Sequence, residues 1–393
     1  MLTGPRSYLD HAATTPMLAV AVEAMTRELG RTGNASSLHG SGRAARRVVE
    51  ESRESIAAGV GAQPAEVIFT SGGTEADNLA VKGAYWSRRG AEPARTTVVV
   101  STIEHHAVLD AAEWLADAQG ATVKLAVVDE AGLVDLDHLS RVVGSSTALV
   151  SVIWGNNEVG TIQPIPEIAA LAAASGSLSH SDAVQAVGHV AVDFAASRLD
   201  LMTLTGHKLG GPYGVGALLA KREVQLTSIL HGGGQERDVR SGTLDVAAIA
   251  GFAAAVQHAV GQRAAEELRL RSLRGQLAAG ISALVPDARV NGPTAPDEAL
   301  PGVLNVALPG CEAATLLMLL DAAGIDCSAG SACSAGVSRP SHVLAAMGRS
   351  DAEAMSCLRF SLGHTSTRAD VDAVLTVLYE AVGRARAAAA LTV

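Results

Sequence analysis

Cysteine is scarce in this chain of 393 residues, and its four copies are scattered. They stand at positions 311, 327, 333 and 357, with no C-x-x-C pair and no cysteine–histidine spacing of the zinc-site kind. The spacing therefore argues against a structural zinc site. A reducing compartment fits best, so we expect a cytoplasmic protein in which any of the four cysteines is available as a working thiol.

Positive charge and long apolar runs are also lacking. The chain has 30 Lys and Arg against 40 Asp and Glu, a formal charge of −10, which argues against a broad nucleic-acid surface and predicts no direct nucleic-acid binding. No apolar stretch approaches the roughly 20 residues needed to cross a bilayer. The N-terminus shows no basic start followed by an apolar core, so we expect neither a membrane anchor nor a signal peptide.

What the chain does have is enough length for two or three domains, and an alternation of short apolar runs with helical patterns. Strands separated by helices predict right-handed crossovers and a mostly parallel sheet in an α/β fold. We expect strands at 67–70, 96–101, 122–128, 147–153, 177–180, 201–205 and 214–220. We expect helices up to about 29 and at 42–60, 76–87, 108–119, 136–143 and 166–174.

The residue composition changes after residue 243. An alanine- and arginine-rich helix is expected over 245–285, with a break near Gly261. Further elements are expected at 303–308, 313–323, 341–347, 357–361 and 368–388, which indicates a smaller α+β domain. We predict an N-terminal arm (1–15) that joins the small domain, a large domain (16–260), and a small domain (261–393) with a mobile loop at 328–340.

Lys208 lies in the segment TGHKLGG (205–211), directly after the predicted strand 201–205. An ammonium group at the end of a buried strand is costly, and a desolvated lysine becomes a nucleophilic amine that forms a Schiff base with an aldehyde. The hydroxyl of Thr205 and the ring of His207 are donors placed to hold an anion, such as the phosphate of pyridoxal phosphate. The alternative is an ordinary surface lysine after a strand.

Four further polar segments follow predicted strands. The turn at 71–74 is rich in glycine and opens a helix, which makes a cup for an anion, although such turns are common. His105 can stack on an aromatic ring or move a proton, or it can cap a helix. Asn157 offers an amide donor to a phenolate or a carboxylate. A buried Asp182 needs a cation such as a protonated pyridine nitrogen, unless it is a helix N-cap.

These segments meet at one place if the sheet is parallel, because ligands bind at the carboxyl ends of parallel strands. They supply phosphate donors, a stacking ring, a phenolate donor, a carboxylate and a lysine. Those are the groups that a pyridoxal phosphate site needs.

The segment SAGSACSAG (328–336) differs, because its small residues cannot form a packed core. We expect a mobile surface loop whose Cys333 is exposed and available for thiol chemistry. Cys311, Cys327 and Cys357 fit the role of buried bystanders better. Arg359 is either a surface charge or a clamp for a substrate carboxylate.

Nine segments together resemble the cysteine desulfurases, which belong to the fold-type I, class-V aminotransferase-like enzymes that use pyridoxal phosphate. The resemblance runs from residue 8 to about residue 363, and the loop cysteine combined with RSGT is specific to the desulfurases. The segments are YLDHAATTP, TSGGTEADNLA, EHHAVLD, NNEVGTIQPI, SDAVQAVG, TGHKLGGPYGVGAL, HGGGQERDVRSGT, GSACSAG and LRFSLG.

The resemblance implies a role for each residue of the site. Catalysis would fall to Lys208, which carries the cofactor, to Cys333, which accepts the sulfur, and to His105. The cofactor-binding set would be Gly73, Thr74, His105, Asn157, Asp182, Gln185, Thr205, His207 and Lys208, with Thr243 reaching the phosphate of the neighbouring subunit. The substrate-binding set would be Asn34, Asn157 and Arg359. No resident metal is implied, although Cys333 could ligate a transient iron–sulfur cluster.

The implied activity is removal of sulfur from L-cysteine, giving L-alanine and a persulfide on Cys333. The implied partners are a second copy of the chain and sulfur acceptors, namely a transfer-RNA thiolation enzyme, an iron–sulfur scaffold or apo iron–sulfur proteins. A selenocysteine lyase or an aminotransferase on the same fold is the first alternative, and Cys333 speaks against an aminotransferase. A non-catalytic binding protein is the second, and the presence of both Lys208 and Asp182 speaks against it.

The sequence departs from the family pattern in three places. The segment 177–181 is more polar than usual, so we expect a looser strand there. The loop at Asn34 lacks the proline that usually follows the asparagine. The chain resembles the long-loop, housekeeping group but ends at Val393, a few residues after its last predicted helix, without the extension that docks a scaffold in related enzymes. We therefore expect weak scaffold binding.

Overall fold

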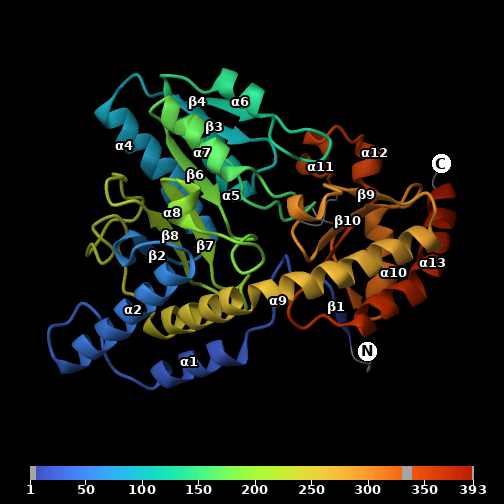
Figure 1. Cartoon of the computed structure of the whole chain (residues 1–393), viewed down its shortest axis with the longest axis horizontal. Coiled ribbons are helices and arrows are strands. Elements are labelled where there is room, and N and C mark those ends of the chain that lie inside the picture. The colour runs from blue at the N-terminus through green and yellow to red at the C-terminus, as the bar shows by residue number, and fades with distance from the viewer. Residues whose placement is uncertain (1–5, 330–338, 392–393) are drawn as a thin grey trace.

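A seven-stranded sheet forms the centre of the larger half of the molecule (Figure 1). The computed structural model describes residues 6–329 and 339–391. The strand order is β2-β8-β7-β6-β5-β3-β4, and all strands are parallel except β8, which runs antiparallel to both neighbours. This confirms the mostly parallel α/β fold. The strands are β2 (Val67–Thr70), β3 (Thr97–Ser101), β4 (Thr122–Ala126), β5 (Thr147–Ser151), β6 (Leu178–Asp182), β7 (Leu201–Thr205) and β8 (Gly216–Ala220).

Helices cover both faces of this sheet, which is why its central strands are buried from end to end. One face packs against α2, α6, α7, α8 and the first part of α9, and the other against α3, η2, α4 and α5. The helical elements of this half are α1 (Ala19–Leu29), α2 (Gly40–Gly59), η1 (Pro64–Glu66), α3 (Gly73–Asn78), η2 (Leu79–Gly83), α4 (Ala84–Ala91), α5 (His106–Gln119), α6 (Leu136–Val142), α7 (Ile165–Ala174) and α8 (Phe194–Ser197).

The polar strand β6 is not loosened, contrary to our expectation. It lies in the middle of the sheet with its side chains almost fully buried. Ser179 Oγ donates to Asp200, and the two ring nitrogens of His180 lie 2.8 and 3.1 Å from the hydroxyls of Ser151 and Thr203. Hydrogen bonds between neighbouring strands thus offset the cost of burying these polar groups.

A smaller half is built on the three-stranded antiparallel sheet β12-β10-β9 and the short parallel pair β1-β11. Helices α10 and α13 pack onto it, and a second apolar core fills the space between them. The sequence did not predict β1, β9, β11 or α12. The elements are β1 (Ser7–Tyr8), β9 (Arg289–Asn291), η3 (Pro296–Glu298), β10 (Val303–Ala307), α10 (Ala313–Ala322), β11 (Ile325–Asp326), α11 (His342–Ala346), α12 (Asp351–Ala354), β12 (Cys357–Ser361) and α13 (Arg368–Ala390).

Helix α9 (Val246–Leu284) spans both halves as one uninterrupted helix of 39 residues, as Figure 1 shows. The predicted break near Gly261 is therefore wrong. Gly261 lies on the exposed side of the helix, where a Cβ atom would meet nothing within 4 Å. Glycine lowers helix propensity, but it does not end a helix whose residues before and after the glycine are held by packing. The domain boundary at 260/261 stays a prediction.

None of the helices in the described ranges combines the length and the apolar character needed to cross a membrane.

Replacing Gly261 by alanine should raise the free energy of unfolding by roughly 0.5–1 kcal/mol, because alanine costs less backbone entropy in a helix. Denaturant unfolding at a fixed cofactor concentration measures the change. Gly251→Ala in the same helix is the matched control and should destabilise, since its Cβ would lie 2.5 Å from Cγ of Met25. A loss of stability in Gly261→Ala would contradict the continuous helix.

Candidate active site

Five predicted site residues follow strands that end at the same edge of the large sheet. Gly73 follows β2, His105 follows β3, Asn157 follows β5, Asp182 ends β6 and Lys208 follows β7. These strands run in one direction, so their carboxyl ends converge. The topology therefore gathers residues that are far apart in the sequence.

Lys208 is half-buried, and its Nζ donates to the backbone carbonyl oxygens of Ala12 at 2.5 Å and Ala13 at 2.7 Å. Burial lowers the pKa of Lys208 to about 8, and the nearby guanidinium of Arg359 adds to the effect, while Asp182 and Asp10 oppose it. A lysine with this pKa is partly neutral near physiological pH. Only the neutral amine attacks an aldehyde, so the site can form a Schiff base at that pH.

Gln185 donates to the same segment of backbone as Lys208. Its side chain is buried and Nε2 donates to the carbonyl oxygen of Ala12 at 2.8 Å. The sequence did not reveal that the N-terminal arm would supply acceptors to both Gln185 and Lys208, because no pattern in a single sequence connects positions 12 and 208.

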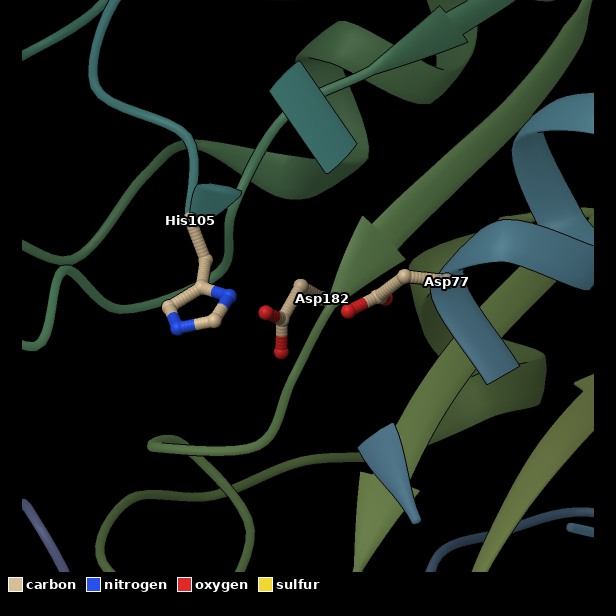
Figure 2. Close-up of side chains that lie close together, drawn as sticks. All are labelled: Asp77, His105 and Asp182. Atoms are coloured by element: carbon tan, nitrogen blue, oxygen red, sulfur yellow. The ribbon is translucent and has the colours of Figure 1, made fainter. Parts of the chain in front are cut away.

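Asp182 is 5% exposed and lies between the imidazole of His105 and the carboxyl group of Asp77 (Figure 2). One ligand-type atom from each of the three lies within 4.8 Å of the other two. Asp182 accepts one hydrogen bond, from the backbone N–H of Val184 at 2.9 Å. Burial raises the pKa of Asp182, although His105 and Lys208 counteract it. Among the helices of the described ranges, none begins directly after Asp182, so the N-cap alternative is wrong.

Asp77 is the residue of this group that the sequence analysis missed. It is 1% exposed, and its Oδ1 has no hydrogen-bond partner in the described part of the chain. Burial and the neighbouring Asp182 raise its pKa well above the usual range. Two buried carboxylates side by side cannot both ionise at low cost, so Asp77 keeps the proton. No local signal in the sequence marks it, because Glu75 and Asn78 lie beside it in the chain.

The charge of the group formed by Asp77, His105 and Asp182 suits a ligand that carries a single positive charge. With Asp77 neutral, these two carboxyl groups carry at most one negative charge. A carboxylate–imidazole group could hold a metal ion, but a protonated ring nitrogen matches the charge with one unit. His180 is also close to Asp77, with Nε2 3.7 Å from Asp77 Oδ1. Burial lowers the pKa of His180 to about 3, so its ring is neutral and supplies no positive charge.

His105 both caps a helix and faces the site. Its Nδ1 accepts a hydrogen bond from the N–H of Ala107 at 3.1 Å as the N-cap of α5. The capping alternative is therefore correct, and it fixes the orientation of the ring without excluding stacking. The preceding residue, Glu104, is fully buried, and burial raises its pKa to about 8.

The predicted anion cup lies where Gly72 and Gly73 begin α3 with no side-chain cap on the helix. The backbone of Gly72 packs so closely on β8 that a Cβ atom at Gly216 would lie 2.9 Å from its Cα. Thr74 is exposed at this turn, and the buried Thr205 hydroxyl lies nearby, 3.9 Å from a Cβ atom built on Gly72. Such a helix start suits a phosphate group.

His207 completes this side of the site. Its ring stacks on Tyr213 with 5.6 Å between centroids, and its Nδ1 lies 3.3 Å from the hydroxyl of Thr14. Burial lowers the pKa of His207 to about 4, so it is a neutral donor.

Arg359 is not a surface charge. It is 4% exposed on β12, Nη2 lies 2.7 Å from Asp10 Oδ1, and Nη1 donates to the carbonyl oxygen of Asn157 at 3.1 Å. Arg359 also lies close enough to Lys208 to lower its pKa. The smaller sheet thus brings a guanidinium to the edge of the larger one.

Two predicted residues are not joined to this group within the described chain. Asn34 lies on an exposed loop, where its Oδ1 accepts from the N–H of Ser36 at 2.8 Å. Thr243 is exposed, and no hydrogen bond in the described ranges connects it to the residues around Lys208. Cys333 lies outside the described residues.

The other three cysteines are poor nucleophiles. Burial raises the pKa of Cys327 and of Cys357 to about 12, and it also raises the pKa of the buried Cys311. Since the thiolate is the reactive form, these thiols are largely inert at neutral pH.

The sequence matches the aminotransferase class-V family over residues 7–374. The chain belongs to this family. Its members use pyridoxal phosphate, and so does this chain. The buried Asp182, the low pKa of Lys208 and the open helix start fit the ring nitrogen, aldehyde and phosphate of that cofactor.

Several named proteins are similar over nearly the whole chain. An "IscS-like cysteine desulfurase" from Mycobacterium tuberculosis is 55% identical over 385 residues, covering 98% of both chains. A "cysteine desulfurase" from Cereibacter sphaeroides is 41% identical and covers 97% of both. Among solved structures, a "NifS-like protein" aligns with a TM-score of 0.89 at 34% identity, covering 96% of this chain and 100% of that one.

The titration of Lys208 predicts how cofactor uptake depends on pH. At pH 7.5 roughly a quarter of Lys208 is neutral, against roughly one part in a thousand for an unperturbed lysine. The rate at which the cofactor-free protein forms its lysine–cofactor bond should rise about tenfold per pH unit below pH 7, then level off above about pH 8. Stopped-flow absorbance measures this rate, with Lys208→Ala as the blank. A rate that still rises tenfold per unit above pH 9 would show an unperturbed lysine.

Proposed function

We propose that this chain is a cysteine desulfurase, which takes sulfur from L-cysteine to give L-alanine and a persulfide on Cys333. The observation that carries the proposal is the half-buried Lys208 near the buried carboxyl group of Asp182 at one sheet edge. The similar proteins support it, because those named cysteine desulfurase align with nearly the whole chain.

Each residue has a definite task in this proposal. Bound pyridoxal phosphate supplies the electron sink that lets the substrate lose its Cα proton. Asp182 holds the ring nitrogen protonated, and His105 stacks on the ring. Gln185 and Asn157 hold its substituents, while Gly73, Thr74, Thr205 and His207 bind the phosphate. Lys208 first anchors the cofactor and, once displaced, its amine takes the Cα proton.

Sulfur transfer belongs to Cys333. Its thiolate attacks the substrate sulfur, so an S–S bond forms as the bond from Cβ to sulfur breaks. The electron pair of the broken bond stays with Cβ, which takes up a proton to become the methyl group of L-alanine. Arg359 and Asn34 hold the substrate carboxylate during this step. The loop around Cys333 must reach both the cofactor and an external acceptor, which requires it to move between them.

The partners follow from the product. A protein-bound persulfide must be handed on, so sulfur-accepting proteins are required, and iron–sulfur cluster assembly and transfer-RNA thiolation are the two routes we propose. We further propose a homodimer in which Thr243 of one subunit reaches the phosphate bound by the other, and a cytoplasmic location.

Cys333→Ser should bind L-cysteine and change the visible absorbance of the holoenzyme, yet release sulfide at least about a hundredfold more slowly. The reason is that Cys333 acts only after the substrate is bound. Sulfide release and absorbance are measured on the same sample. Cys327→Ser is the matched control and should keep its activity, since burial holds that thiol protonated. Undiminished sulfide release from Cys333→Ser would overturn the proposal.

A further inference from the structure

One nitrogen of the Arg359 guanidinium, Nε, has no hydrogen-bond partner in the part of the chain that the structure describes. Asp10 engages Nη2 at 2.7 Å, and the carbonyl oxygen of Asn157 engages Nη1 at 3.1 Å. Nε itself is buried. A buried cation with an unused N–H group is costly unless a ligand completes it. Nε and Nη2 lie on the same side of a guanidinium, so the unused donor adjoins the one that Asp10 occupies.

Asp10 itself is firmly held. Its carbonyl oxygen accepts from Tyr8 Oη at 3.1 Å and from the N–H of Ala13 at 3.0 Å. The next residue, His11, donates its N–H to the carbonyl oxygen of Ser361 on β12 at 3.1 Å. Since Arg359 lies on the same strand two residues earlier, the Asp10 carboxylate and the guanidinium are fixed on one backbone framework.

The same short segment also positions Lys208. Asp10 engages Arg359, while the carbonyl oxygens of Ala12 and Ala13 accept from Lys208 Nζ. An α-amino acid offers a carboxylate and a Cα proton two bonds apart. A single turn of chain that holds both the guanidinium and the lysine can therefore set the distance between the groups that bind these two parts.

We propose that Asp10 is a positioning residue that aims Arg359 at the substrate carboxylate, holding Nη2 so that the Nε–H remains free for a carboxylate oxygen. This inference rests on the proposed function. Asp10 neutralises the buried guanidinium when no substrate is present, and it fixes the rotamer, so that less side-chain freedom is lost when the carboxylate binds.

Two ligands that differ only in the carboxylate test the role of Asp10. L-alanine keeps the carboxylate of the substrate, whereas L-alaninamide has a neutral amide in its place, and neither can donate sulfur. Binding of each to the holoenzyme is titrated by the change in visible absorbance. Asp10→Ala should weaken L-alanine at least tenfold and change L-alaninamide less than about twofold. Asp10→Asn, which keeps an acceptor for Nη2, should recover most of the affinity for L-alanine.

Three results would overturn the proposal. Unchanged L-alanine binding in Asp10→Ala would show that Arg359 needs no partner. Equal weakening of both ligands would show a merely structural role, and tighter L-alanine binding would show that Asp10 competes with the substrate. Arg359→Lys is the positive control and should lose the preference for the carboxylate. Sulfide release from L-cysteine by the unchanged chain is measured separately, so its absence would reject the proposed function without deciding the role of Asp10.

Discussion

A buried carboxyl group at the end of β6 is the constraint on which the site depends. Asp182 is buried beside a second acid, Asp77, and the fully buried Glu104 lies close enough to affect both. Carboxylates removed from water need a cation or a proton. Asp77 and Glu104 take protons, while Asp182 is left facing His105 with one backbone hydrogen bond. In the function we propose, the protonated ring nitrogen of the cofactor supplies the cation that this edge lacks.

The N-terminal arm is the second element on which the site depends, because it joins the two halves of the molecule. Its first strand pairs with β11 of the smaller half, and Leu9 lies in the core of that half. A few residues later its carbonyl oxygens hold Lys208 of the larger half. Arg359 N–H also donates to the carbonyl oxygen of Ser328, where the segment leading to Cys333 begins. Hydrogen bonds thus link the N-terminal arm to Lys208 and, through Arg359, to the start of the segment that leads to Cys333.

Several features escaped the sequence for identifiable reasons. The polar run before Asp182 predicted a loose strand, but its partners for hydrogen bonding, Ser151 and Thr203, lie on neighbouring strands. We predicted a helix break at Gly261, but α9 stays continuous because its residues before and after Gly261 are packed against the rest of the molecule. Strands of two or three residues, such as β1 and β11, are too short to show a period and exist only because they pair with each other.

The sequence by itself determined the alternation of strands and helices, the polar segments at the strand ends and, through Lys208 and its neighbours, the chemistry of the site. These are local patterns, and each can be recognised from residues adjacent in the chain. Only the tertiary structure decided that Lys208 is held by Ala12 and Ala13, that Asp77 lies behind Asp182, and that Arg359 is buried against Asp10. The reason is physical: burial and ion pairing, which set the charge of these groups, arise from segments up to about 350 positions apart that meet only in the folded chain.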